Sequence, residues 1–136
     1  MSAQQEGLLP LGIESMLLSG RIAYHDFEGI VTDPDKLSRI VADLGDKDVL
    51  LFRNHGLLAC GRTVAEAFYL MYMLQRSCEI QVAALASNRD LLLWNPAIEQ
   101  KVMAESRQAG TNLGQYDLVL SALMRVLDRE EPGYRQ

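Results

Sequence analysis

Two short apolar runs joined by a three-residue corner constrain the fold of this chain more than any other feature of its sequence. Residues 48–52 read DVLLF, residues 56–60 read GLLAC, and Arg53-Asn54-His55 connects them. Short runs that are almost wholly apolar are typical of buried strands, and a connection this short lets two strands pair antiparallel. The sequence therefore predicts a buried hairpin whose corner carries one of the chain's two histidines.

Capping residues predict a helix on each side of this hairpin. Asp33 is placed as an N-cap with Pro34 at the first helical position, and Gly45 ends the helix. Its apolar stripe consists of Leu37, Ile40, Val41 and Leu44. Thr63 and Glu66 form a T-x-x-E capping box in front of a long helix that runs to about residue 87.

Weaker signals predict three more helices and one more strand. Residues 13–20 form a short helix that ends at Gly20, and residues 21–24 form a short strand followed by the polar loop HDFEG. Asn95-Pro96 starts a helix that ends by Gly110, and a last amphipathic helix carries Leu118, Leu120, Leu123, Met124 and Leu127. The element order predicts an α/β protein with a small sheet, in which helices dominate the second half.

Composition excludes several classes of protein. The 136 residues are enough for one domain, residues 1–136. A net charge of −5 without any basic cluster argues against nucleic acid as a partner, and no apolar run reaches the roughly 18 residues of a membrane span. Cys60 and Cys78 lie in apolar runs, which predicts buried, reduced thiols. Without a visible signal peptide, we expect a cytoplasmic protein.

The long helix also predicts self-association. Between residues 64 and 87 apolar side chains occur on most sides of the helix, and few charges interrupt them. A helix of this kind must be covered on most of its sides, and one small sheet covers only one side of it. We therefore expect a homo-oligomer, with a dimer as its smallest unit.

The two histidines are the first candidates for a functional site, and the residues alone leave their roles open. His55 suits a metal ligand, a catalytic base or a hydrogen-bonded turn residue, and Gly56 beside it leaves room for a close approach. His25 lies next to Asp26 and Glu28, a grouping that suits either acid–base work or a solvated polar loop. No H-x-H, H-E-x-x-H or C-x-x-C pair occurs, so the sequence alone builds no complete metal site.

Long stretches of the chain resemble the class II aldolase/adducin family. The first is VLLFRNHGLLACGRTVAEAFYLMYMLQRSCEIQVAALA at residues 49–86, which has the order strand, N-H-G corner, strand, capped helix. The entry QEGLLPLGIESMLLSGRIAYHDFEGIV is similar to the adducin-type branch, with its GLLP segment and YHDYEG-like loop. This resemblance implies a three-layer α/β/α fold with a small, largely antiparallel sheet flanked by helices.

The resemblance also implies roles for two residues. In the metal-dependent members, the histidine of the N-H-G corner is one of three zinc ligands, which assigns a zinc-binding role to His55. The other two ligands come from an H-x-H pair upstream of the corner, and the acid–base carboxylate also lies upstream. This sequence contains neither, so we expect it to be the C-terminal half of a family domain, shortened at its N-terminal side. In the family's aldolases a tyrosine near the C-terminus donates a proton at the active site of a neighbouring subunit, and Tyr134 of this chain resembles that tyrosine.

Two functions follow from the resemblance. The first is a zinc-dependent lyase in the full-length form, acting on a small hydroxy-carbonyl or sugar-phosphate-like substrate through an enediolate, with this chain inactive alone and the assembly a dimer or tetramer. The second is a non-catalytic, adducin-head-like oligomerisation module, because one fold serves many functions.

Overall fold

The computed structural model describes residues 1–30, 33–108 and 113–135, and all of their side chains except those of 106–108 and 113–115. In chain order the elements are α1 (Ile13–Leu18), β1 (Ile22–His25), α2 (Pro34–Leu44), β2 (Val49–Phe52), β3 (Gly56–Ala59), α3 (Val64–Ala86), α4 (Pro96–Gln108), α5 (Leu113–Glu130) and the 3-10 helix η1 (Pro132–Arg135). The predicted element order is therefore confirmed. The predicted helix end at Gly110 lies outside the described residues.

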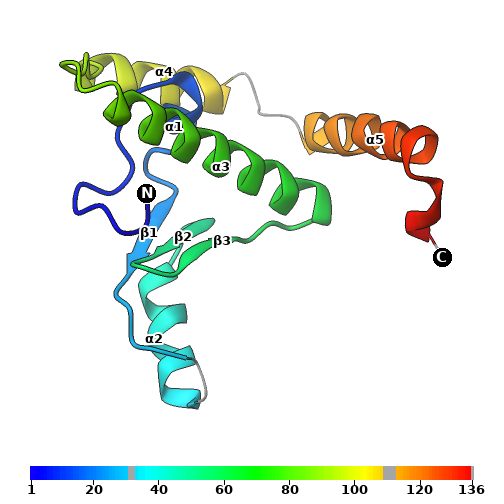
Figure 1. Cartoon of the computed structure of the whole chain (residues 1–136), viewed down its shortest axis with the longest axis horizontal. Helices are drawn as coiled ribbons and strands as arrows, with labels where there is room; N and C mark the ends of the chain where they lie inside the picture. The colour runs from blue at the N-terminus through cyan, green and yellow to red at the C-terminus, as the bar shows by residue number, and fades with distance from the viewer. Residues whose placement is uncertain (31–32, 109–112, 136) are drawn as a thin grey trace.

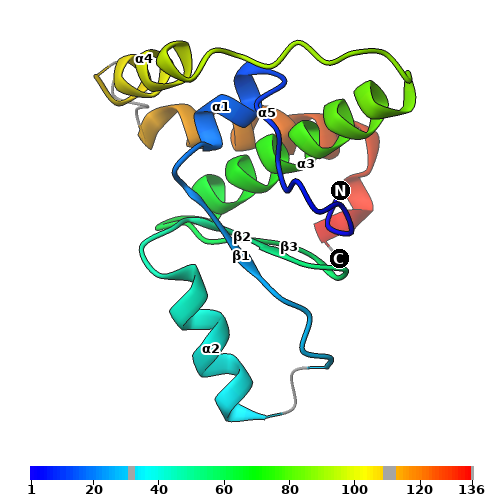
Figure 2. The same cartoon turned by 90° about the vertical axis from the view of Figure 1, so that its left-hand side faces the viewer.

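A small sheet separates two helical layers, which confirms the three-layer α/β/α prediction. Helix α2 covers one face of the sheet, and α3 with α1 covers the other, as Figures 1 and 2 show. Alternate residues of β2 point to opposite faces. Val49 therefore packs against Leu70 and Leu74 of α3, while Leu50 packs against Ile40 of α2. α4 lies against α1, and α5 against α3.

The sheet has three strands in the order β1-β2-β3, and its pairing is mixed. β2 and β3 pair antiparallel as the predicted hairpin, with Phe52 opposite Gly56. β1 pairs parallel with β2, because α2 forms the crossover between them. The antiparallel character implied by the resemblance is thus limited to the hairpin. His25 and Phe52 are neighbours at the end of the parallel pair, which places a histidine beside the hairpin corner.

The predicted caps are present at both helix starts. The Asp33 carboxylate accepts a hydrogen bond from the Asp35 amide at 2.9 Å. The Thr63 hydroxyl accepts one from the Glu66 amide at 3.1 Å, and the Glu66 carboxylate accepts one from the Arg62 amide at 2.8 Å. Each start therefore satisfies donors that the helix itself leaves free.

Three sequence-based expectations were wrong in detail. Cys78 is buried as predicted, but Cys60 is exposed, because it follows the last residue of β3 and lies outside the sheet. Of the apolar stripe of α2 only Ile40 is buried, at 9% exposure, while Leu37 and Val41 are 55% and 60% exposed. The first strand begins and ends one residue later than predicted, so His25 belongs to β1 and not to a solvated loop.

Helix α3 buries one face and leaves much of the rest accessible. Its buried apolar residues, Ala65, Leu70, Met73, Leu74 and Cys78, form a single stripe. Three further apolar residues, Phe68, Tyr72 and Val82, lie on another side of the helix and are 38–50% exposed, and we call them the outer stripe of α3. In the described part of the chain, no helix is long and apolar enough to cross a membrane.

Candidate functional site

The hairpin corner holds His55 at the open end of the sheet. Asn54 has a φ of 55°, the left-handed conformation that asparagine tolerates better than most residues. The His55 amide donates to the Phe52 carbonyl at 3.2 Å and closes the turn. The His55 side chain is exposed. A Cβ added to Gly56 would meet nothing within 4 Å in the described part of the chain, so no close contact there explains this glycine.

The N-terminal residues 1–9, which we call the strap, fix the corner from one side. The Asn54 amide donates to the Ser2 carbonyl at 3.1 Å, and Arg53 Nη1 donates to the Gln4 carbonyl at 2.7 Å. The Arg53 guanidinium also lies 4.7 Å from the centroid of the Tyr24 ring. These contacts restrain both residues that precede His55, so the imidazole extends from a fixed backbone.

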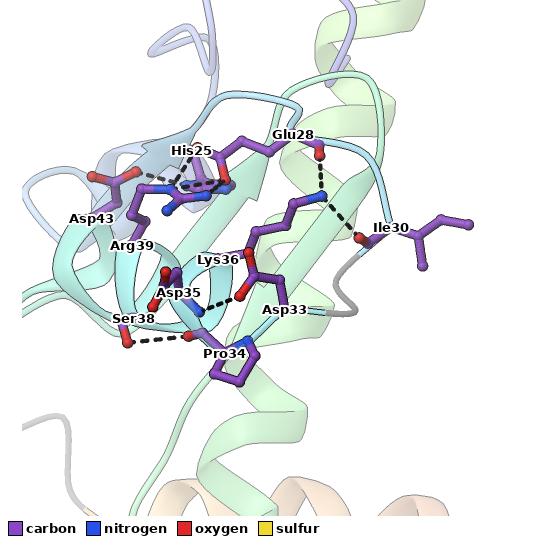
Figure 3. Close-up of polar contacts among 10 residues, drawn as sticks. All are labelled: His25, Glu28, Ile30, Asp33, Pro34, Asp35, Lys36, Ser38, Arg39 and Asp43. Carbon is purple, nitrogen blue, oxygen red and sulfur yellow. Dashed lines mark hydrogen bonds and ion pairs between the residues drawn. The ribbon is translucent and has the colours of Figure 1, made fainter.

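His25 is buried and paired with a carboxylate that sequence reasoning missed. Its residue is only 5% exposed, and Nδ1 lies 2.7 Å from Oδ2 of Asp43 on α2. The expected partners were Asp26 and Glu28, its neighbours in sequence. Asp43 is the partner instead, because the His25 side chain points to the face of the sheet against which α2 packs (Figure 3). No local pattern links two residues 18 positions apart.

The structure brings both histidines to one small cavity. Its lining also includes Asp26, Phe27, Glu28 and Lys36, and its volume is about 10 Å³, which is room for about one water molecule. The Phe52 ring lies between the histidines, 5.6 Å from the centroid of each. The Phe27 ring stands edge-on to His55 at 6.2 Å. His25 and His55, 30 residues apart in sequence, thus belong to one site.

Two basic residues of α2 hold the loop that covers this cavity. Arg39 donates to both carboxylate oxygens of Glu28 at 2.7–3.0 Å, and Lys36 Nζ donates to the carbonyls of Glu28 and Ile30 at 2.7 and 3.2 Å (Figure 3). The hydrogen bonds from Arg39 lower the pKa of the Glu28 carboxyl below its usual value. The Glu28 carboxylate is therefore committed to Arg39, and it anchors residues 26–30 to α2.

The described residues do not by themselves fit a zinc site. Within residues 1–30, 33–108 and 113–135, no group of three His, Cys, Asp or Glu side chains is arranged to hold a metal ion. A catalytic zinc uses three protein ligands and one open position. His55 offers one imidazole, and His25, whose Nδ1 is on Asp43, adds at most Nε2, which still leaves fewer than three ligands. A metal bound at His55 would need ligands from outside this set.

Tyr134, the second residue singled out by the resemblance, lies away from the histidines. It belongs to η1, at the end of the chain that projects from the rest of the molecule in Figure 1. Its hydroxyl donates to Asp128 at 2.8 Å and accepts from Arg135 Nε at 2.8 Å. Tyr134 is not among the residues that line the cavity. Within one chain, the structure does not bring Tyr134 to His55.

The small sheet between helical layers, with an N-H-G corner at its end, defines an α/β protein of aldolase-like architecture. Residues 1–82 match the Class II Aldolase and Adducin N-terminal domain family, and the chain belongs to that family.

Relatives and solved structures support the same assignment. The chain is 44% identical to the "Putative aldolase class 2 protein" of Caulobacter vibrioides, covering 98% of this chain and 52% of the relative. It is 41% identical to alpha-adducin of Rattus norvegicus, covering 99% of this chain and 20% of the relative. An aldolase II superfamily protein from Pseudomonas syringae superposes with a TM-score of 0.89 at 40% identity, covering 99% of this chain and 54% of that one.

The L-fuculose 1-phosphate aldolase of Glaciozyma antarctica PI12 shares the fold. It superposes with a TM-score of 0.71 at 20% identity, covering 95% of this chain and 48% of that one. The chain thus spans about half the length of the aldolase-type relatives that it matches. Those relatives have residues beyond the matched region.

Proposed function

We propose that this chain is the His55-bearing part of a class II aldolase-type lyase that acts on a small hydroxy-carbonyl or sugar-phosphate-like compound. In this proposal His55 is one metal ligand, and the remaining ligands come from family residues outside this chain. The chain alone is then inactive as a lyase, because the residues that the structure describes form neither a complete metal site nor a substrate-sized cleft at the cavity.

The observation that carries the proposal is the geometry of the corner. Arg53 and Asn54, which precede His55, are hydrogen-bonded to the strap, and the His55 amide closes the turn on the Phe52 carbonyl. The His55 side chain is exposed. A ligand that must meet partners from another segment needs such a fixed backbone and an accessible side chain. A histidine that served only the turn would be expected to use its ring on a neighbouring backbone group.

Metal retention tests this proposal directly. We expect the isolated chain, dialysed after exposure to zinc, to retain far less than one ion per molecule, because one imidazole does not make a tight site. His55→Ala should retain the same small amount. One tightly held zinc per wild-type chain, lost in His55→Ala, would show that the chain completes the site itself and would contradict this division of ligands.

Complementation gives the positive arm of the test. The part of the Caulobacter vibrioides relative that lies outside the matched region is the natural source of the missing ligands. Mixed with this chain, that polypeptide should restore stoichiometric zinc in the wild type but not in His55→Ala, which keeps the corner and lacks only the imidazole. Restoration in His55→Ala would remove His55 from the ligand set.

A second candidate function is a non-catalytic assembly module, as the adducin resemblance suggests. The observation that favours it is apolar surface far from the cavity. The outer stripe of α3 is 38–50% exposed, and on α5 Leu118, Leu123 and Leu127 are 39–71% exposed. Apolar surface of this extent on helices is typical of association sites. The two functions are compatible, since a lyase site between subunits also requires assembly.

We therefore expect a homo-oligomer, a dimer or tetramer, at micromolar concentration. Tyr72→Asp places a charge in the centre of the outer stripe of α3 and should shift the mass measured by light scattering towards the monomer. Lys101→Glu changes an exposed residue of α4 and serves as the control. A wild-type chain that remains a stable, soluble monomer would show that this stripe needs no cover.

A further inference from the structure

His25 carries a feature that a purely structural histidine does not need. Its Nδ1 is hydrogen-bonded to Asp43 at 2.7 Å, while the imidazole also lines the cavity that His55 shares. A carboxylate on one ring nitrogen fixes the tautomer, and it leaves the lone pair on the other nitrogen. The Asp43 side chain is half-exposed, so the carboxylate of the pair is in contact with solvent while the imidazole is buried beside the cavity.

The open atom is Nε2. Among the described residues Asp43 is the polar partner of the imidazole, through Nδ1. In the same part of the chain, no fully buried side-chain nitrogen or oxygen lacks a hydrogen-bond partner. Nε2 is the ring nitrogen that Asp43 leaves free, and His25 as a whole is 5% exposed. His25 lines the cavity, whose volume of about 10 Å³ admits one water molecule or one hydroxyl group.

We propose that His25, oriented by Asp43, is a proton-accepting residue of the His55 site, and that its ligand is a water molecule or the hydroxyl group of a small hydroxy-carbonyl compound. The hydroxyl proton moves to Nε2, the oxygen keeps the bonding electron pair, and the resulting imidazolium is held against the Asp43 carboxylate. The proposal deepens the lyase function given above and rests on it for the identity of the compound. The reactivity of the imidazole does not depend on it.

The alternative is that the pair only fastens α2 to the sheet. Asp43 lies on α2 and His25 on β1, and few other buried contacts hold that helix. The two interpretations give opposite results when Asp43 is replaced by asparagine. A fastening pair, once weakened, exposes His25 and makes it more reactive. A tautomer-fixing carboxylate, once replaced by an amide that can donate or accept, makes Nε2 less reactive.

Exchange of the imidazole Cε1 proton for deuterium in D₂O, located by peptide mass spectrometry, measures this reactivity, because the exchange needs only water at the ring and proceeds through the protonated imidazole. We expect His25 in the folded chain to exchange, because the cavity admits a water molecule, and Asp43→Asn to slow that exchange by about ten-fold, the low end of what losing such a partner costs. His55 in the same molecules should change by less than about two-fold and is the internal reference. A His25 that does not exchange in the folded wild type, or faster exchange in Asp43→Asn, would overturn the proposal.

A matched control and a variant-free measurement complete the test. Asp46→Asn makes the same chemical change at an exposed carboxylate just beyond α2, and it should leave the exchange at His25 unaltered. If Asp43→Asn does not fold, long-range ¹H–¹⁵N spectra of the wild type decide the question. The Nδ1–H tautomer of His25 supports the proposal, and the Nε2–H tautomer overturns it. Neither readout involves zinc, so a failed complementation experiment would leave this result standing.

Discussion

Leu74→Asp should unfold the chain at room temperature. Leu74 is 0% exposed and lies in the core formed by α1, β2 and α3, against Leu18, Val49 and Leu70. The substitution removes a buried leucine and leaves an unpaired carboxylate in its place, a loss of roughly 5 kcal/mol or more. That is comparable with the whole stability of a small domain. Circular dichroism during urea titration would show no cooperative transition.

Val64→Asp is the control for this prediction. Val64 lies on the same helix but is 79% exposed, and at the start of α3 a negative charge interacts favourably with the helix dipole. It should change the free energy of unfolding by no more than about 0.5 kcal/mol. His55→Ala should also cost about 1 kcal/mol or less, because the side chain is exposed. A loss in His55→Ala as large as that in Leu74→Asp would make His55 a structural residue.

The parts of the fold that sequence reasoning predicted are those that local chemistry determines. The caps at Asp33 and Thr63 depend on side chains two or three residues from the amides that they satisfy. The hairpin depends on an asparagine that accepts a positive φ. Such features are encoded within a few positions, so they can be read without knowing the tertiary structure.

The His25–Asp43 pair shows where that reasoning stops. Asp26 and Glu28 are near His25 in sequence, yet the contact is made with a residue 18 positions away. It depends on the parallel pairing of β1 with β2 and on the line along which α2 crosses the sheet, neither of which has a local signal. The exposure of Cys60 has a similar origin, because it depends on where β3 ends.

The residues of the candidate site also separate into those with a local sequence signal and those without one. His55 was found because the N-H-G corner is a contiguous motif that the family resemblance places in a role. Lys36 and Arg39 were not predicted as part of the site, because their contribution is to hold the loop of Glu28 against α2. Basic residues on a helix surface do not by themselves predict such a contact. A fold shared by adducins and aldolases cannot decide between assembly and catalysis, so the reactivity of the two histidines has to be measured.

Gln81 links the core helix to the functional corner, through the strap. Its side chain is 0% exposed; Oε1 accepts from the Leu9 amide at 2.7 Å, and Nε2 donates to the Gly7 carbonyl at 2.9 Å and to Gln4 Oε1 at 3.0 Å. The strap in turn holds Asn54 and Arg53 beside His55. A polar residue with every hydrogen bond satisfied inside a helix–strap interface is stabilising only while its partners are present.

Gln81→Leu should therefore cost about 2–4 kcal/mol, because leucine fills the volume but strands one buried amide and one buried carbonyl. The same change should speed hydrogen exchange at the Asn54 amide, which donates to Ser2, since the strap is no longer anchored. Gln75→Leu is the matched control: Gln75 is exposed on the same helix and its side chain donates a hydrogen bond to Glu79, away from the strap's backbone, so both measurements should stay near wild type. Unchanged exchange at Asn54 in Gln81→Leu would mean that the corner is held independently of the strap, by its own turn.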